Sequence, residues 1–138
     1  MLFGKRKRSI HRILIVEDEP LVAFDNEHFL RDAGYDIVAT VDRVGEALRF
    51  IATGDLDLVL ADIRLSDGSG LDVARAAREK AIPLLFVTGQ CPPEARGLAM
   101  GVLVKPYSHR ELVAAIDALD ARIAGRPAKR PPPGLSLF

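Results

Sequence analysis

Five short apolar runs alternate with segments in which apolar residues recur at helical spacing. Short apolar runs bounded by turn residues are typical of strands that are buried on both faces of a sheet. The runs predict strands at about residues 12–17, 35–41, 57–62, 83–87 and 102–104.

The segments after the apolar runs predict helices. Pro20 suits a first helical position, and residues 44–51 place apolar side chains at i, i+3, i+4 and i+7. Ser108 and Glu111 have the spacing of a capping box, and Gly97 interrupts the least regular of the helical segments. The expected helices are 20–34, 44–54, 71–80, 91–100 and 108–123.

Strands and helices therefore alternate along the chain, which predicts an α/β sandwich around a parallel sheet with right-handed connections. We expect one domain at 12–123, preceded by a basic, flexible arm at 1–11. The segment 124–138 is rich in proline, so we expect it to be a disordered tail.

Four of the expected strands stop at a residue that can handle a phosphoryl group. The first ends in Glu17 and Asp18, the third in Asp62, the fourth in Thr88 and the last in Lys105. In an open parallel sheet, ligands bind outside the carboxyl ends of the strands. If the strands are neighbours, one edge gathers three carboxylates, a hydroxyl and an ammonium group.

This set of groups suits a divalent cation and phosphoryl transfer. Mg²⁺ prefers oxygen ligands, and a cation relieves the repulsion among the carboxylates of Glu17, Asp18 and Asp62. Asp62 can attack phosphorus and form an aspartyl-phosphate. Lys105 can pair with one transferred oxygen and Thr88 can hydrogen-bond another.

Composition narrows the setting. The chain has 138 residues and a formal net charge of zero, so no overall field favours nucleic acid. The single cysteine, Cys91, cannot form an intrachain disulfide and indicates a reducing compartment. No apolar stretch approaches the roughly 20 residues of a membrane span. We expect a cytoplasmic protein without a membrane or nucleic-acid partner.

The motifs at the strand ends resemble the receiver domain of two-component response regulators over about residues 11–123. They are Ile-Leu-Ile-Val-Glu17-Asp18-Glu19-Pro20, Asp57 to Asp62 followed by Gly68 and Gly70, Thr88-Gly89 and Lys105-Pro106-Tyr107. The resemblance implies a three-layer, flavodoxin-like fold with helices on both faces of a five-stranded parallel sheet of order 2-1-3-4-5. It also implies a bacterial phosphorelay in which a histidine kinase or a histidine phosphotransfer protein donates phosphate to Asp62.

The same resemblance assigns roles at the site. Asp18 and Asp62 are expected to ligate Mg²⁺ directly, Glu17 through water, and Arg64 through its backbone carbonyl. The Lys105–Pro106 bond is expected to be a cis peptide. A downstream protein is expected to bind the 89–123 face of a monomer or weak dimer. No enzymatic activity is expected beyond self-phosphorylation and autodephosphorylation.

Two features depart from the usual receiver pattern. Val102 stands three residues before the lysine, where receivers usually carry tyrosine or phenylalanine as a rotamer switch. The segment 83–89 resembles the Pro-Phe-x-Phe-Ala-Thr-Gly motif of the FAT-GUY group, stand-alone receivers that lack this aromatic residue. We therefore predict a stand-alone receiver that signals by phosphorylation-dependent contacts or phosphate relay. Phosphorylation is predicted to order segment 89–101 through Thr88.

The alternative functions fit the motifs less well. A Mg²⁺-dependent aspartyl-phosphate phosphatase of the haloacid-dehalogenase type expects its nucleophile in an Asp-x-Asp pattern after the first strand. Here Asp62 follows the third strand, and Arg64 stands where the second aspartate is needed. A flavodoxin-like module that binds FMN is a further alternative, but the acidic segment 17–19 would repel the phosphate of FMN.

Overall fold

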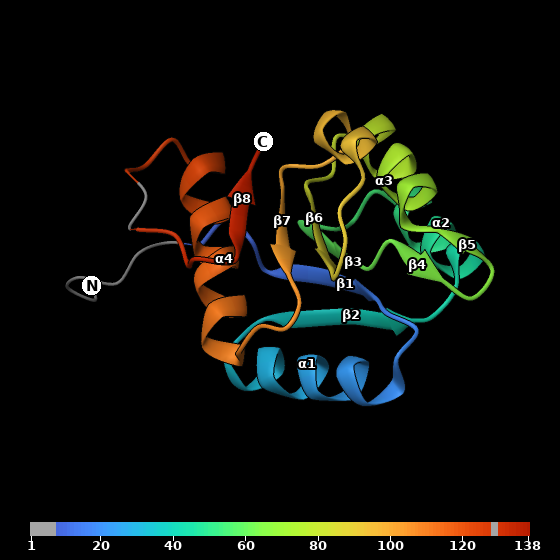
Figure 1. Ribbon diagram of the computed structural model, residues 1–138, viewed down its shortest axis with the longest axis horizontal. Coiled ribbons are helices and arrows are strands. Elements are labelled where there is room, and N and C mark those ends of the chain that lie inside the picture. Colours follow the sequence, from blue (N-terminus) through green and yellow to red (C-terminus); the bar gives the residue numbers. More distant parts are fainter. Residues whose placement is uncertain (1–7, 128–129) are drawn as a thin grey trace.

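The computed structural model, which describes residues 8–127 and 130–138, places strands and helices in alternation (Figure 1). Its strands are β1 (Arg12–Val16), β2 (Asp36–Val41), β3 (Leu58–Ala61), β4 (Arg64–Leu65), β5 (Gly68–Ser69), β6 (Leu84–Thr88), β7 (Gly101–Val104) and β8 (Leu135–Leu137). Its helices are α1 (Pro20–Asp32), α2 (Val44–Ala52), α3 (Gly70–Glu79), α4 (His109–Ile123) and the 3-10 helix η1 (Pro93–Gly97).

The parallel part of the sheet has the order β2-β1-β3-β6-β7. β4 and β5 form a separate antiparallel pair, so β6 and β7 are the fourth and fifth strands of the parallel sheet. The expected order 2-1-3-4-5 is therefore confirmed. In the register of the sheet, Val16 at the end of β1 lies beside Val41 of β2 and Ala61 of β3. The three strands therefore end together, and the residues that follow them reach the same edge.

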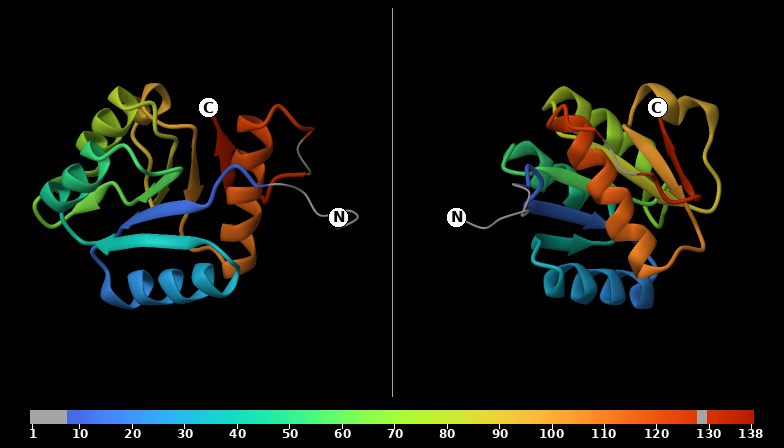
Figure 2. Two further views of the ribbon diagram at one scale, coloured as in Figure 1. Left: turned by 180° about the vertical axis from the view of Figure 1, so that it is seen from behind. Right: turned by 90° about the vertical axis from the view of Figure 1, so that its left-hand side faces the viewer.

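Helices cover both faces of the sheet (Figure 2). Side chains alternate along β1, so Leu14 packs in one apolar cluster with residues of α2 and α3. Ile13 packs in a second cluster with residues of α1 and α4. Each fully buried side chain of this size contributes roughly 1.5–3 kcal/mol by leaving water. The two clusters hold the sheet rigidly between the helix layers, and the strand ends are fixed with it.

The segment between β6 and β7 differs from its prediction. Residues 91–100 were expected to form an α-helix, but they contain only the five-residue η1. Pro92 and Pro93 lack backbone N–H groups, and Gly97 has low helix propensity. A longer series of helical hydrogen bonds is therefore unfavourable here. The N–H of Met100 instead donates to the carbonyl of Leu84, 2.9 Å away, which leads the chain into β7.

The expectation of a disordered tail is wrong for residues 135–137, because they form β8. This strand pairs antiparallel with β7 and adds a sixth strand to the sheet. Leu135 is buried, so an apolar contact stabilises the pairing. Residues 128–129 lie outside the described part of the chain.

The expected flexible arm is likewise wrong for residues 8–11. Ile10 is only 1% exposed, and the N–H of Ser9 donates to Asp120 of α4 at 2.9 Å. The guanidinium of Arg8 lies 4.4 Å from the centre of the Tyr35 ring. Residues 1–7 of the expected arm fall outside the described residues. None of the helices in the described ranges combines the length and apolar character that crossing a membrane requires.

Candidate phosphoryl-acceptor site

Three carboxylates meet at the carboxyl edge of β1 and β3. The N–H of Glu17 donates to the carbonyl of Val41, and that of Asp62 to the carbonyl of Val16, each at 2.9 Å. These bonds continue the sheet by one residue and fix where both side chains begin. Carboxylate oxygens of Glu17, Asp18 and Asp62 all lie within 4.8 Å of one another. The sheet therefore brings together the three acids that the sequence predicted.

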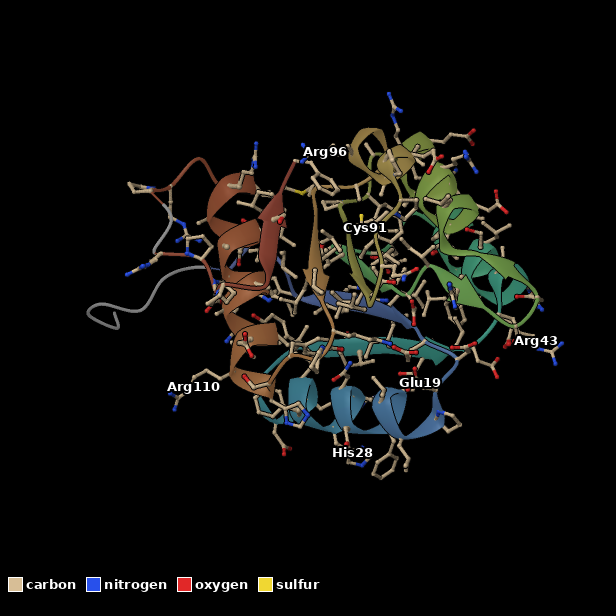
Figure 3. All side chains as sticks on the ribbon, viewed as in Figure 1. Glu19, His28, Arg43, Cys91, Arg96 and Arg110 are labelled. Carbon is tan, nitrogen blue, oxygen red and sulfur yellow. The ribbon has the colours of Figure 1, made fainter. Side chains whose placement is uncertain are left out.

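Lys105 reaches this acidic group from the end of β7. Its Nζ donates to Glu17 Oε1 and to Asp62 Oδ2, each at 2.9 Å, and Glu19 Oε1 lies 3.8 Å away. Figure 3 labels Glu19 at the start of α1. The N–H of Lys105 donates to the carbonyl of Thr88, and the Lys105–Pro106 bond is cis, as expected. The ammonium therefore bridges two acids, Glu17 directly after β1 and Asp62 directly after β3.

Burial and charge act together on the ionisation of this group. Burial raises the pKa of Glu17, although hydrogen bonds from Lys105 and from the Glu19 N–H oppose the change. Burial alone would lower the pKa of Lys105, but hydrogen bonds and charge from Glu17 and Asp62 outweigh it and raise this pKa. Lys105 is therefore a firmly charged ammonium at neutral pH.

Asp62 is held by backbone as well as by Lys105. Its Oδ1 accepts from the N–H of Ile63 at 2.7 Å and faces the N–H of Arg64 at 3.4 Å. Gly70 packs against the same peptide, because its N–H donates to the carbonyl of Ile63 at 2.7 Å. A Cβ at Gly70 would lie 2.0 Å from the carbonyl oxygen of Asp62, so no larger residue fits without a backbone shift. Gly70 thus helps to position Asp62.

Thr88 lies where the sequence predicted, at the end of β6 on the same edge of the sheet. Its side chain is buried, and its hydroxyl donates to the carbonyl of Gln90 at 3.1 Å. This bond closes the first turn of the segment that leads to η1. Arg64 lies in β4, two residues beyond Asp62. The role of its carbonyl as a metal ligand stays a prediction.

One polar pair beside the site, between buried Asn26 and half-buried Tyr107, was not found from the sequence. Nδ2 of Asn26 in α1 donates to the hydroxyl of Tyr107 at 2.8 Å. Burial raises the pKa of this phenol. The pair ties α1 to the loop that follows Lys105. Its signal in the sequence is the spacing of Ala23, Asn26 and Leu30, which places a polar residue on the buried face of a helix.

The acidic group has the chemistry of a Mg²⁺ site. All three donors are carboxylate oxygens, which a hard cation prefers. Glu17, Asp18 and Asp62 carry up to three negative charges, whereas Lys105 supplies a single positive charge within contact distance of two of them. The excess negative charge, gathered at a partly buried edge, fits a divalent cation.

Comparisons with known proteins agree with this geometry. Residues 13–117 match the family model described as the response regulator receiver domain. The transcriptional regulatory protein TorR of Escherichia coli is 38% identical over 120 residues, which are 82% of this chain and 51% of TorR. PdtaR of Mycobacterium tuberculosis is 34% identical over 117 residues, covering 80% of this chain and 57% of PdtaR. The chain thus spans about half the length of these curated relatives.

Solved structures show the same fold. A CheY-like receiver domain protein from Methanospirillum hungatei superposes with a TM-score of 0.76 at 26% identity, covering 85% of this chain and 98% of that one. The signal receiver domain of a modulated diguanylate cyclase from Desulfovibrio desulfuricans gives 0.73 at 27% identity, with the same coverage. Together with the three acids and the lysine at one sheet edge, these matches show that the chain belongs to the response regulator receiver domains of two-component systems.

Proposed function

We propose that this receiver accepts a phosphoryl group on Asp62 from a histidine kinase or a histidine phosphotransfer protein, with Mg²⁺ as cofactor. The observation that carries the proposal is the convergence of Glu17, Asp18 and Asp62 within 4.8 Å, with Lys105 bonded to two of them. Phosphoryl transfer depends mainly on positioning and charge stabilisation, and this edge supplies both.

In the proposed step, a carboxylate oxygen of Asp62 forms a bond to phosphorus while the bond from phosphorus to the donor imidazole breaks. The electron pair of the broken bond returns to the imidazole nitrogen. Oδ1 of Asp62 is held by the N–H of Ile63, and Oδ2 is held by Lys105. As negative charge moves onto the phosphoryl oxygens, Lys105 can transfer one of its hydrogen bonds to them.

Glu17, Asp18 and Asp62 would hold Mg²⁺, and the carbonyl of Arg64 would add a ligand. When bound, the ion supplies positive charge that offsets the repulsion between the Asp62 carboxylate and the anionic phosphoryl group. Lys105 also neutralises part of the negative charge at the site. Its hydrogen bond to Glu17 orients the ammonium toward Asp62.

We further propose that phosphorylation acts on protein contacts through Thr88. Its hydroxyl bonds to the carbonyl of Gln90, so turning it toward a phosphoryl oxygen would release that carbonyl and reorder the segment 89–101. Val102 offers no aromatic ring to flip. Signalling then proceeds through a downstream protein at the 89–123 face, or by phosphate relay, from a stand-alone cytoplasmic receiver.

The first test is labelling with a small phosphodonor such as acetyl phosphate in the presence of Mg²⁺. A phosphate-affinity gel should show one retarded species, which Asp62→Asn and removal of Mg²⁺ with EDTA each abolish. Asp72→Asn is the matched control, because it removes the same charge from an exposed position on α3. Absence of a retarded wild-type species contradicts the proposal. Rapid turnover of phosphomonoesters would instead support the phosphatase alternative.

The donor class needs a separate measurement. A phosphorylated histidine phosphotransfer domain should pass its label to the wild-type chain and to Asp72→Asn, and not to Asp62→Asn. Labelling by acetyl phosphate without labelling by phosphohistidine donors would retain Asp62 as the acceptor and reject the proposed donor class.

A further inference from the structure

The outer edge of β7 is covered by a segment of the same chain. β8 pairs with it, so that Leu103 faces Leu135 and Gly101 faces Leu137. At the two ends of this pairing, the N–H of Val104 donates to the carbonyl of Gly134 at 3.0 Å, and that of Phe138 donates to the carbonyl of Met100 at 2.9 Å. Without β8, the outermost strand of the parallel sheet would present unpaired backbone groups.

The side chains of β8 alternate in their surroundings. Leu135 is buried in the cluster that holds Leu103 and residues of α4, and Leu137 is half-buried against the same cluster. Ser136, between them, points to solvent and is exposed. The edge of β7 therefore accepts an extended segment by main-chain hydrogen bonds and by apolar contacts at alternate positions. This is the chemistry by which proteins recognise an added β-strand.

One residue of β7 and one residue of η1 accommodate β8. A Cβ at Gly101 would lie 2.5 Å from the carbonyl oxygen of Ser136, so the glycine leaves room for the backbone of β8. The guanidinium of Arg96 in η1, which Figure 3 labels, lies 5.4 Å from the centre of the Phe138 ring. The acceptor thus includes the start of β7 and the adjoining 3-10 helix.

Few backbone pairs hold β8 on the edge of β7. β8 pairs over only three residues, and the prolines at 131–133 keep the connection before it from joining a helix or strand. The other five strands of this sheet stay paired with one another without it. Short edge elements of this kind open at far lower free energy than the core of a domain.

We propose that the edge of β7 is an interaction surface for an extended segment of a partner protein with apolar residues at alternate positions, and that residues 134–138 hold this surface closed. The seated segment Gly134-Leu135-Ser136-Leu137-Phe138 displays the chemistry that such a partner needs. The surface is part of the 89–123 face named in the proposed function, but its existence does not depend on phosphorylation of Asp62.

The test uses the full chain without any phosphodonor. Leu135→Asp places a carboxylate in a buried apolar position and should release β8, whereas Ser136→Asp adds the same charge at the exposed neighbour. The probe is a fluorescent peptide with the sequence of residues 133–138, and its binding is followed by fluorescence anisotropy. The Val104 N–H donates a hydrogen bond to the carbonyl of Gly134 when β8 is paired. Hydrogen exchange of this N–H therefore reports independently whether β8 has separated from β7.

A tethered segment competes with a free peptide at an effective concentration in the millimolar range. Leu135→Asp should therefore bind the peptide at least roughly ten-fold more tightly than the wild type or Ser136→Asp, with a similar fall in Val104 protection. A peptide in which both leucines are serine should not bind.

Equal peptide affinity in Leu135→Asp and Ser136→Asp would overturn the proposal, and so would unchanged Val104 protection in Leu135→Asp. If wild-type chains instead form dimers by exchanging β8, and Leu135→Asp abolishes these dimers, the occupant is a second copy and the assignment to another protein is wrong. Failure of Asp62 to accept phosphate would leave each of these outcomes unaffected.

Discussion

Lys105→Met is the substitution that most directly probes how the acidic edge is stabilised. Methionine keeps an unbranched chain but removes the ammonium that bonds to Glu17 and Asp62. Both acids are buried, so two carboxylates lose their shared counter-charge in a place that water reaches poorly. We expect the fold to lose stability in the absence of Mg²⁺.

The size of the effect follows from burial. Removing one partner of a buried ion pair costs roughly 3–5 kcal/mol, because the other charge stays uncompensated. The lower end applies here, since the Lys105 side chain is itself 19% exposed. A loss of about 3 kcal/mol in the free energy of unfolding corresponds to a fall in melting temperature of roughly 10 °C for a domain of this size.

The loss should depend on pH. Burial raises the pKa of Glu17, and without Lys105 it rises further, so the folded variant binds a proton that the unfolded chain has released. Stability falls with rising pH wherever the folded state binds more protons. The penalty should therefore be larger at neutral and alkaline pH than at acidic pH, where Glu17 becomes neutral.

Urea denaturation followed by circular dichroism, in EDTA and then in Mg²⁺, measures this penalty. Lys80→Met is the control, since Lys80 is exposed at the end of α3 and the change also removes one ammonium. A loss that equals that of the control, or that does not vary with pH, would refute the reasoning. Mg²⁺ should recover part of the stability, because it supplies another counter-charge to the same acids.

Three further substitutions test the supports of the site. Gly70→Ala should cost about 1–3 kcal/mol in urea denaturation, because its Cβ overlaps the Asp62 backbone; Gly45→Ala, which meets nothing within 4 Å, should not, and equal losses would contradict the clash. Thr88→Val should remove the change in hydrogen exchange across η1 that a phosphoryl mimic causes in the wild type, and an unchanged response in the variant would exclude the proposed route. Tyr107→Phe should cost about 1–3 kcal/mol in thermal melts by leaving the buried amide of Asn26 without its acceptor, and no loss would show that the amide finds another partner.

The acidic edge was predictable because each of its members follows directly from a buried strand. Parallel strands in register end together, so Glu17, Asp62 and Thr88 had to approach one another once the sheet order was correct. The lysine was placed by the same logic, at the end of β7. Its direct bonds to Glu17 and Asp62 required coordinates, because sequence order does not say how a long, flexible side chain folds back.

The ends of the described chain were not predictable by the same means. Leu135, Ser136 and Leu137 alternate, but three residues after a run of prolines carry too little pattern to indicate a strand. Ile10 stands alone beside basic residues, and its burial depends on a contact between Ser9 and α4 that joins distant parts of the sequence. The basic and proline-rich composition of these end segments predicts that they stay in solvent. A few tertiary contacts instead order residues 8–11 and 135–137.

The chain enters and leaves the described fold at one pole. Ile10 precedes the start of β1, and the N–H of Phe138 donates to the carbonyl of Met100 just before β7 begins, so both ends of the described fold lie beside the amino ends of parallel strands. Asp62 lies at the opposite pole, about 15 Å away along a strand of this length. A fluorophore or a surface tether attached at Phe138 would therefore lie away from Asp62 and would leave the acidic edge open.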